Sequence, residues 1–572
     1  MEKPKIGVYV CWCGNNIAKM VDVEAVAEEL KDVPNLVVSK DYKYMCSDPG
    51  QDMVVKDIKE NNLDRIVVSA CSPRLHEATF RKTLKKAGLN PYMLQIANIR
   101  EHDAWVHTDR EKATFKAREL INAAINRVSY HEPLAERLVD INPATLVIGG
   151  GISGMSAALE IADTGKQVFL VEKSDKLGGQ LADIDLIFPY FNSSRQKIQP
   201  LINQVENHEY IEIYKKAQVS EISGYIGNFE ALVQVNSDEC TLEFGNIIVA
   251  VGLKTWDPGP IKEYGYGTLP DVITSAEFEK MLKSGQIVKK DGKEPQHIAI
   301  IHCVGSRNSR YNNYCSRICC TTALKYANQV RSALPDSNIY ELYADMRSMA
   351  KGCEELYTIT SRKRVMFLMF DQENDLPRIK KADPGDTADM VIELNEVRTR
   401  KQLEIPADMV ILMTAMDSRE ETQSVAHAAG VSLCGNKFFI EKHPKLDPVA
   451  TTTSGVYIVG SCQGPKEIPD SIAQSRAAAA RVLGTIHKGK ASVEVTTAFV
   501  EASRCCACKM CIPVCPYVAI SFNEKRNISE INGALCQGCG ACVALCRPKA
   551  IDIKGSSQMQ VIAELDALFF PN

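Results

Sequence analysis

The sequence lacks a long hydrophobic run and a strong excess of charge of either sign. No stretch of about 18 apolar residues occurs in its 572 residues, which argues against a membrane-spanning helix. The formal net charge is only −4 and the charges are mixed along the chain, so we expect no basic surface for nucleic acid or anionic lipid. Residues 1–14 also lack the pattern of an export signal. We therefore expect a cytoplasmic protein whose partners are other proteins.

Cysteine, in contrast, is abundant, with 21 residues. So many cysteines are typical either of a secreted protein held together by disulfides or of a cytosolic protein that binds metal, and the first class needs an export signal. The chain is too long for one hydrophobic core, and its length predicts about three to five domains. We therefore interpret most of the cysteines as metal ligands that belong to several domains.

The C-terminal region carries the spacing CxxCxxCxxxC twice. The eight cysteines are Cys505, Cys508, Cys511, Cys515, Cys536, Cys539, Cys542 and Cys546. Such a run binds a [4Fe-4S] cluster through its first three thiolates, and its fourth crosses to the other cluster. We therefore expect Cys515 to join the second set and Cys546 the first. A zinc ribbon is the alternative, but it uses CxxC pairs separated by a longer insert.

A dinucleotide-binding fingerprint begins at Thr145. A short apolar strand runs into Gly149, Gly151 and Gly154 as GxGxxG, and the residues after them favour a helix. The three glycines allow a tight turn, the approach of a pyrophosphate, and the packing of the helix on the strand. Glu172 ends the next strand, where an acid can accept a hydrogen bond from a ribose hydroxyl. A glycine-rich loop without a ligand is the alternative.

FAD and NAD share this fingerprint, so later segments must distinguish them. A second glycine turn follows the acid, a strand over 247–251 comes next, and a late strand over 455–460 precedes a helix over 471–482. This order resembles the two-dinucleotide-domain flavoproteins of the thioredoxin reductase type and predicts FAD. In that family the late strand usually ends in Gly-Asp, whereas Ser461 follows Gly460 here. The expected cofactor-binding residues are Gly149, Gly151, Ile152, Ser153, Gly154, Glu172, Lys173, Gly178, Gly179, Gln180, Ala250, Gly252, Gly460 and Ser461.

The insertion over 295–416 stands where those flavoproteins have a pyridine-nucleotide domain. Its first strand leads into residues 302–306, HCVGS, which lack the three glycines that a pyrophosphate needs, so NAD(P)H binding is not expected there. Four cysteines gather at this place instead: Cys303, Cys315, Cys319 and Cys320. They predict another [4Fe-4S] cluster beside the flavin. The alternative is that some of them are small buried hydrophobic residues.

The first 130 residues form a separate α/β unit with cysteines of its own. These are Cys11, Cys13, Cys46 and Cys71, at three sites that each lie just after a strand. Strand ends of an open α/β sheet converge on one crevice, so four thiols can reach a single cluster there. Metal-free thiols are the alternative, because the spacing is irregular.

Six motifs together resemble the A-type polypeptide of heterodisulfide reductase. They are CWCGNNI (11–17), MCSDPGQ (45–51), ACSPRLHEATFR (70–81), NIREHDAWVH (98–107), YCSRICC (314–320) and QGPKEIPDSIAQSRAAAA (463–480). The resemblance implies an FAD protein with four [4Fe-4S] clusters and flavin-based electron bifurcation. The implied partners are a donor dehydrogenase or hydrogenase subunit, ferredoxin, and B- and C-type subunits that reduce a disulfide, in a complex that is compatible with a homodimer.

The resemblance also implies a catalytic role for Lys325, which falls at the lysine placed near the flavin N5 atom. Its sequence position alone favours a solvated surface lysine, because most lysines are exposed. Two other functions stay open: a relay subunit of another anaerobic complex, such as benzoyl-CoA reductase, and a stand-alone NAD(P)H oxidoreductase.

The predicted fold class is α/β multidomain: a thioredoxin-reductase-like flavoprotein with an N-terminal α/β iron-sulfur domain and a C-terminal two-cluster ferredoxin domain. The expected limits are 1–130 for the N-terminal domain, 131–143 for a linker, 144–294 for the first part of the FAD domain, 295–416 for the degenerate NAD(P)-like domain, 417–487 for the second part of the FAD domain, and 488–572 for a linker and the ferredoxin domain.

Overall fold

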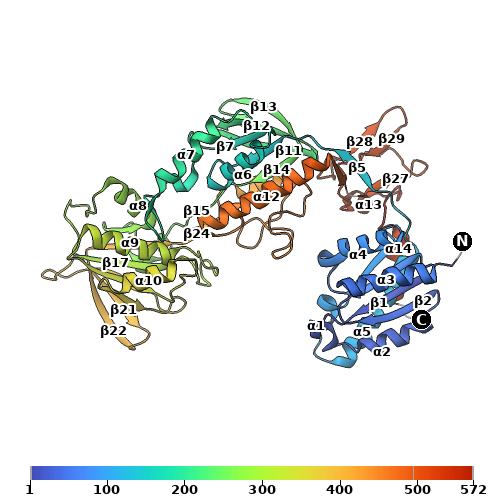
Figure 1. The fold of residues 1–572 in the computed structure, drawn as a ribbon, viewed down its shortest axis with the longest axis horizontal. Helices are drawn as coiled ribbons and strands as arrows, with labels where there is room; N and C mark the ends of the chain where they lie inside the picture. The colour runs from blue at the N-terminus through green and yellow to red at the C-terminus, as the bar shows by residue number, and fades with distance from the viewer. Residues whose placement is uncertain (1–2, 494, 570–572) are drawn as a thin grey trace. The chain divides into compact units, whose positions relative to one another are not determined.

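The computed structural model describes residues 3–493 and 495–569, and Figure 1 labels its helices and strands. The chain divides into two compact units. Unit 1 consists of Met1–Leu138 and Ser492–Asn572, and unit 2 of Val139–Ala491. The C-terminal segment therefore belongs to the same unit as the N-terminal sheet.

Unit 1 is built on a parallel sheet of four strands. In spatial order these are β2 (Leu36–Tyr42), β1 (Ile6–Cys11), β3 (Arg65–Ala70) and β4 (Leu94–Asn98). Every residue of β1 is buried, as expected for a central parallel strand that is covered on both faces. Its alternating side chains enter two separate cores: one with α2 (Val23–Glu29) and α5 (Arg110–Ser129), the other with α3 (Asp48–Asn61) and α4 (Pro73–Ala87).

The C-terminal part of unit 1 consists of two short antiparallel pairs and two helices. The pairs are β27 (Ala498–Val500) with β30 (Ile551–Ile553) and β28 (Ile520–Asn523) with β29 (Ile528–Ile531), and the helices are α13 (Ala541–Leu545) and α14 (Gln558–Phe569). Helix α14 packs on α5, where Arg127 forms an ion pair with Glu564 and the Gln560 amide donates to the carbonyl of Tyr130. A small core with Cys511 and Cys542 holds the pairs together.

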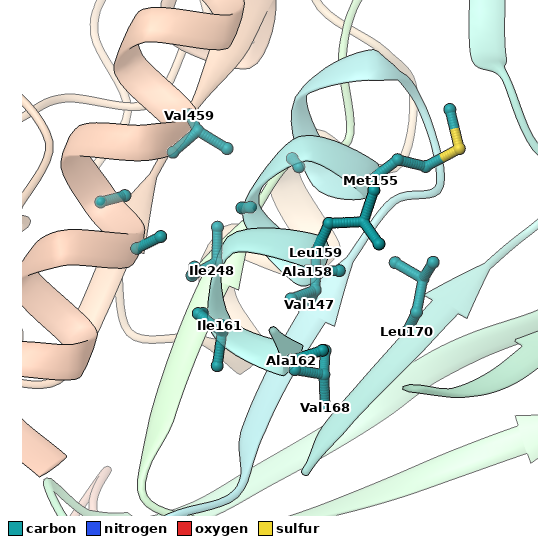
Figure 2. Close-up of a cluster of buried hydrophobic side chains, with 14 of the residues drawn as sticks. Val147, Met155, Ala158, Leu159, Ile161, Ala162, Val168, Leu170, Ile248 and Val459 are labelled. Atoms are coloured by element: carbon teal, nitrogen blue, oxygen red, sulfur yellow. The ribbon is translucent and has the colours of Figure 1, made fainter. Parts of the chain in front are cut away.

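Unit 2 begins with a five-stranded parallel sheet. In spatial order its strands are β10 (Ile211–Lys215), β7 (Val168–Glu172), β6 (Thr145–Ile148), β14 (Asn246–Val249) and β25 (Val456–Ile458). Helices α6 (Ile152–Ala162) and α12 (Ile468–Lys488) pack together against one face, although they are far apart in sequence (Figure 1). Figure 2 labels Met155 and Leu159 of α6 in one buried cluster with Val147 and Leu170 of the strands.

The other face of this sheet is covered by three antiparallel strands. They are β11 (Ala217–Tyr225), β12 (Asn228–Val235) and β13 (Asp238–Phe244). Strand β25, which follows the whole insertion in the chain, forms one edge of this sheet. The glycine turn after β6 lies between the ends of β7 and β14, because β6 is the central strand.

A second five-stranded parallel sheet is inserted into the first. In spatial order its strands are β16 (Val272–Thr274), β23 (Met409–Thr414), β17 (His297–Val304), β18 (Asn338–Tyr343) and β19 (Val365–Met369). The helices α8 (Ser275–Ser284), α9 (Cys319–Ala333) and α10 (Cys353–Ser361) accompany it, together with the antiparallel strands β20 (Arg378–Lys381), β21 (Met390–Glu396) and β22 (Lys401–Ala407).

Two parallel sheets, one inserted into the other and each with three added antiparallel strands, form the two-dinucleotide-domain fold of the thioredoxin reductase type. The predicted fold class is confirmed for this part of the chain. Among the described residues, no helix is both long and apolar enough to cross a membrane.

Candidate dinucleotide cavity and cysteine clusters

A cavity of about 700 Å³ lies at the carboxyl ends of the first sheet of unit 2. Its size is within the range of small-molecule and cofactor sites. The predicted cofactor residues on its wall are Gly149, Gly151, Ile152, Ser153, Glu172, Lys173, Gly178, Gly179, Gln180, Ala250, Gly252 and Ser461. The two other predicted residues, Gly154 and Gly460, do not line this cavity.

Each position of the fingerprint is glycine for a different structural reason. Gly149 has a φ of +112°, and a Cβ atom on it would lie 2.4 Å from the carbonyl oxygen of Ala250. A Cβ atom on Gly154 would lie 1.8 Å from the carbonyl oxygen of Gly149, so α6 could not start so close to the strand. A Cβ atom on Gly151 would clash with nothing, since its nearest neighbour would be the Cα atom of Gly179 at 4.0 Å. The missing side chain thus leaves room beside the first turn of α6, and the cradle fits a pyrophosphate.

Glu172 holds this loop in place. One carboxylate oxygen accepts from the backbone N–H of Gly150 at 2.6 Å, and the other accepts from the backbone and hydroxyl of Ser174 at 2.8 Å. The same residue lines the cavity, so its remaining lone pairs can accept from a ribose hydroxyl. The acid therefore has a second task that the sequence did not indicate, which is to fix the glycine turn.

Three cationic residues of the cavity wall were missed by sequence reasoning: Lys176, Arg419 and Lys466. Lys466 lies just before α12, and its ammonium donates to the side-chain oxygens of Gln463 and Gln474, both at 2.8 Å. Burial lowers the pKa of Lys466. Arg419 also lines the cavity and donates to the carbonyl of Leu253 at 3.3 Å. None of the three belongs to the fingerprint, although Lys466 stands inside the motif over 463–480.

Lys325 is buried in α9 and forms an ion pair with Glu279 of α8. Its side chain is only 1% exposed, and its ammonium also donates to the carbonyl of Leu186 at 3.0 Å. The interpretation of Lys325 as a solvated surface lysine is therefore wrong. Burial lowers the pKa of its ammonium, and the carboxylate of Glu279 opposes that change.

Glu279 lines a second cavity of about 330 Å³, next to the dinucleotide cavity. The two cavities share the wall residues Gln180, Asp183, Ile184, Ile318 and Met416. Cys319 also lines the second cavity. The predicted thiol site, the buried ion pair and the dinucleotide cavity thus meet at the same place.

The predicted thiols of the insertion converge where β17 ends and α9 begins. Cys303 has a φ of +57°, and Cys319 and Cys320 are the first two residues of α9. The thiol of Cys319 interacts with those of Cys303 and Cys320. Cys315 accepts the backbone N–H of Arg317 at 3.2 Å, and it interacts with Arg347, whose backbone also contacts Cys320. The neighbours Cys319 and Cys320 reach one place because the helix starts only at this point.

Contacts among these thiols favour the ionised forms of two of them, Cys303 and Cys320. The hydrogen bond from Cys319 lowers the pKa of Cys303 to about 7 and that of Cys320 to about 4, although burial opposes both changes. The same bonds raise the pKa of Cys319 well above its usual value. Because the thiolate is the form that ligates metal, this donor set fits an iron-sulfur cluster.

The four N-terminal thiols lie at the carboxyl edge of the sheet of unit 1. The thiol of Cys13 interacts with those of Cys11, Cys46 and Cys71. Cys11 accepts the backbone N–H of Cys13 at 3.3 Å, and Arg100, which follows β4, donates to the sulfur of Cys13 at 3.4 Å. The structure therefore brings the four predicted ligands together and adds an arginine beside them.

The C-terminal cysteines line two small cavities. Cys515 lies with Cys536, Cys539 and Cys542, and Cys546 lies with Cys505, Cys508 and Cys511. The fourth cysteine of each run thus faces the set of the other run. The sulfurs of Cys515 and Cys546 each accept a backbone N–H, from Ala519 at 3.4 Å and Ala550 at 3.2 Å. Cys506 also lines the small C-terminal cavity that contains Cys505 and Cys546.

The described residues contain no site of the usual geometry for a single metal ion. Across residues 3–493 and 495–569, no group of three or more His, Cys, Asp or Glu side chains is arranged to hold one metal ion.

A family model and several known proteins are similar to this chain, and their names refer to FAD or to iron-sulfur polypeptides. A family model described as FAD dependent oxidoreductase matches residues 145–223. The chain is 37% identical to the second A-type iron-sulfur polypeptide of CoB–CoM heterodisulfide reductase from Methanopyrus kandleri, over 92% of each protein. It is 36% identical to the A-type polypeptide of H2:CoB-CoM heterodisulfide,ferredoxin reductase from Methanothermobacter marburgensis, over 92% of this chain and 91% of that protein. A solved structure, T. acidophilum thioredoxin reductase, matches 60% of this chain and 99% of its own length at 16% identity and a TM-score of 0.41.

Proposed function

Because this chain belongs to the A-type polypeptide family of heterodisulfide reductase and is an oxidoreductase with an FAD domain, we propose that it divides electron pairs within a complex of that type. Pairs from a donor dehydrogenase or hydrogenase subunit would be split between ferredoxin and subunits of the B and C type that reduce a disulfide. The name of one relative, which includes both a heterodisulfide and ferredoxin, supports these two acceptors.

One observation carries this proposal: thiols replace the second glycine fingerprint directly beside the first cofactor cavity. Cys319 lines the cavity that shares its wall with the dinucleotide cavity. FAD, when bound, exchanges two electrons or one, whereas a [4Fe-4S] cluster passes one electron at a time. A one-electron site next to a two-electron site is the arrangement that electron splitting needs.

The residues of the chain would hold these groups as follows. The glycine turn and the start of α6 would bind the pyrophosphate of FAD, and Glu172 the ribose. Lys325 would place a positive charge near the flavin ring, with Glu279 opposite it. Four clusters would be ligated by Cys11, Cys13, Cys46 and Cys71; by Cys303, Cys315, Cys319 and Cys320; by Cys505, Cys508, Cys511 and Cys546; and by Cys515, Cys536, Cys539 and Cys542.

Anaerobic purification with iron, sulfide and flavin measured together tests the proposal. We expect about sixteen irons and one FAD per chain, because each of four clusters holds four irons. NADH or NADPH alone should not bleach the flavin, because residues 302–306 lack the second glycine fingerprint. About eight irons would confine the clusters to the C-terminal segment and contradict electron splitting. Rapid bleaching by NADH or NADPH would support a stand-alone oxidoreductase instead.

A further inference from the structure

Two ionisable side chains lie fully buried beneath the thiols of the insertion. His302 precedes Cys303 in β17, and Glu341 lies in the neighbouring strand β18. Both residues are 0% exposed, and Nε2 of His302 lies 3.1 Å from a carboxylate oxygen of Glu341. Side chains alternate along a strand, so His302 lies on the same face as Ile298 and Ile300, which pack against α9.

Such a pair is a costly way to fill a core. Removing two charged groups from water costs several kcal/mol per ion, and well-packed hydrophobic residues of similar volume are often equally stable or more so. Core stability alone therefore does not explain why these two residues stand between strands that are otherwise apolar. A role in the neighbouring thiol site would explain it.

The pair also has unused hydrogen-bonding capacity. Among the described residues, Nδ1 of His302 and Oε1 of Glu341 have no hydrogen-bond partner. Buried polar atoms are almost always satisfied, so each exception needs a cause. A bound ligand or cofactor that supplies the missing hydrogen-bond partner is one such cause.

Cys320 is the thiol next to this histidine. The imidazole of His302 interacts directly with the side chain of Cys320. The other groups around the site are Arg307 and Arg347, which both pair with Asp345, whose carbonyl oxygen lies 3.7 Å from the sulfur of Cys320. The ring of Tyr343 lies 6.4 Å from that of His302.

We propose that His302, held by Glu341, is a positioning residue that directs a ring N–H toward the sulfur of Cys320 and raises the reduction potential of the cluster on Cys303, Cys315, Cys319 and Cys320. This inference rests on the proposed function, because it requires that cluster. A donor beside a ligating sulfur stabilises the reduced, more negative cluster, and outer-shell partners of this kind orient the ligands. Glu341 would fix the orientation of the ring by accepting from its other nitrogen.

The test is a redox titration of the full-length holoprotein followed by electron paramagnetic resonance. The signal of this cluster is assigned as the one that disappears in Cys303→Ser. In the double variant His302→Leu with Glu341→Leu, both polar groups are replaced at similar volume, and we expect the signal to be reduced at a lower potential. The signals of the other clusters should keep their potentials. His302→Asn with Glu341→Leu restores an amide N–H near the position of Nδ1 and should recover part of the shift.

A second buried polar pair, between α9 and α10, provides a matched control. Asn328 donates to the hydroxyl of Thr360 at 2.6 Å, and both residues are buried. Asn328→Leu with Thr360→Val should leave the potential of the cluster unchanged, because this pair contacts none of the four thiols. A shift of the same size in this control would mean that any loss of buried polarity changes the cluster, and would overturn the inference.

The remaining outcomes are also decisive. An unchanged potential in the double leucine variant with full iron content overturns the proposal. Loss of this cluster at an unchanged melting temperature supports it, because the ring would then be needed to place Cys320. Loss of the cluster together with a lowered melting temperature shows a purely structural pair. If Cys303→Ser removes neither iron nor a signal, the cluster itself is absent, and the proposed function fails together with this inference.

Discussion

Lys325 and Glu279 form a buried ion pair between two helices, next to the cofactor cavity. A buried ammonium is unfavourable unless it is paired and hydrogen-bonded, and here it has both a carboxylate and a backbone carbonyl as partners. Glu279 itself lines the second cavity, so the pair stands between the protein core and the place proposed for the flavin ring. A charge held there influences how readily electrons are added to a bound cofactor.

Replacing Lys325 with Met and Glu279 with Gln removes both charges and leaves no buried ion unpaired. We expect the flavin to become harder to reduce, with a reduction equilibrium about tenfold less favourable, which corresponds to a lost interaction of about 1.4 kcal/mol. Spectroelectrochemical titration of the purified holoprotein measures this change. Lys293→Met, at an exposed lysine of the same unit, should behave as the wild type. A wild-type flavin potential in the double variant would contradict the role of Lys325.

His131 is a second residue whose burial has a measurable consequence. Its ring donates to the carbonyl of Tyr92 at 3.0 Å, and burial lowers its pKa to about 4, with Arg127, Arg65 and Arg81 as further contributors. In the unfolded chain a histidine has a pKa of about 6.5. Because the folded-state pKa is the lower one, folding favours the neutral ring. The contribution of His131 to stability is therefore full above pH of about 6.5 and is lost as the pH falls toward 4.

Between pH 7 and pH 5 the free energy of unfolding of unit 1 should fall by roughly 2 kcal/mol more in the wild type than in His131→Asn, whose amide can keep the hydrogen bond to Tyr92. Denaturant titrations in a Trp256→Phe background measure this difference, because the remaining tryptophans, Trp12 and Trp105, both belong to unit 1. His487→Asn, at an exposed position of unit 2, serves as control. Equal pH dependence in the wild type and His131→Asn would refute the assignment.

At the scale of elements, α6 is the helix that connects sequence and site most directly. Its glycines separate into those that shape the turn and the one that leaves room for a ligand. A side chain on Gly154 would clash with the backbone of the turn, whereas a Cβ atom on Gly151 would clash with nothing at a φ of −77°, which any residue adopts. Substitutions at these two positions should therefore have different effects.

Gly151→Ala should leave the fold intact and abolish FAD binding, because the added methyl group occupies the space beside the first turn of α6. The measurement is the ratio of flavin to protein after purification, together with the melting temperature of the flavin-free protein. Gly484→Ala, within α12 and without any neighbour inside 4 Å, should keep the flavin and add up to about 1 kcal/mol of stability through helix propensity. Normal flavin content in Gly151→Ala would show that the pyrophosphate lies elsewhere.

For the whole molecule, the separation into two units indicates how the chain can be divided. Unit 2 contains its own cores on both faces of the first sheet and in the insertion. Unit 1 depends on both ends of the chain, because α14 packs on α5. The two units should therefore respond differently to truncation.

A fragment over 139–491 should fold alone, bind one FAD and contain about four irons, because the proposed cluster of the insertion is its only complete ligand set. A fragment over 1–138 should melt at a lower temperature than the same segment supplied together with 492–572, because the apolar face that α5 presents to α14 would be exposed. Flavin content, iron content and melting curves of the purified fragments give the answer. A flavin-free or aggregated fragment over 139–491 would contradict its independence.

The sequence predicted much of this architecture, and the reasons differ from part to part. Continuous apolar runs are typical of buried parallel strands, so the strands that lead into Cys11, Gly149 and Cys303 could be recognised locally. The burial of Lys325 could not, because its partner Glu279 stands 46 residues away and only the packed fold brings the two together. Lys466 was missed because most of the cavity that it lines is formed by segments far from it in sequence. The grouping of the C-terminal segment with the N-terminal sheet depends on which apolar faces pack together. A hydrophobic pattern predicts that a face is buried, but it does not predict which other element covers it.

The late arrival of β25 has a consequence for biosynthesis. Strand β25 completes the first sheet of unit 2 but lies after the whole insertion in the chain. During translation, the sheet of the insertion can therefore be finished while the surrounding one still lacks its last strand, since domains generally fold as units as they emerge from the ribosome. The proposed ligands Cys303, Cys315, Cys319 and Cys320 would then be in place before the dinucleotide site is complete, which would allow a cluster to be inserted before the flavin.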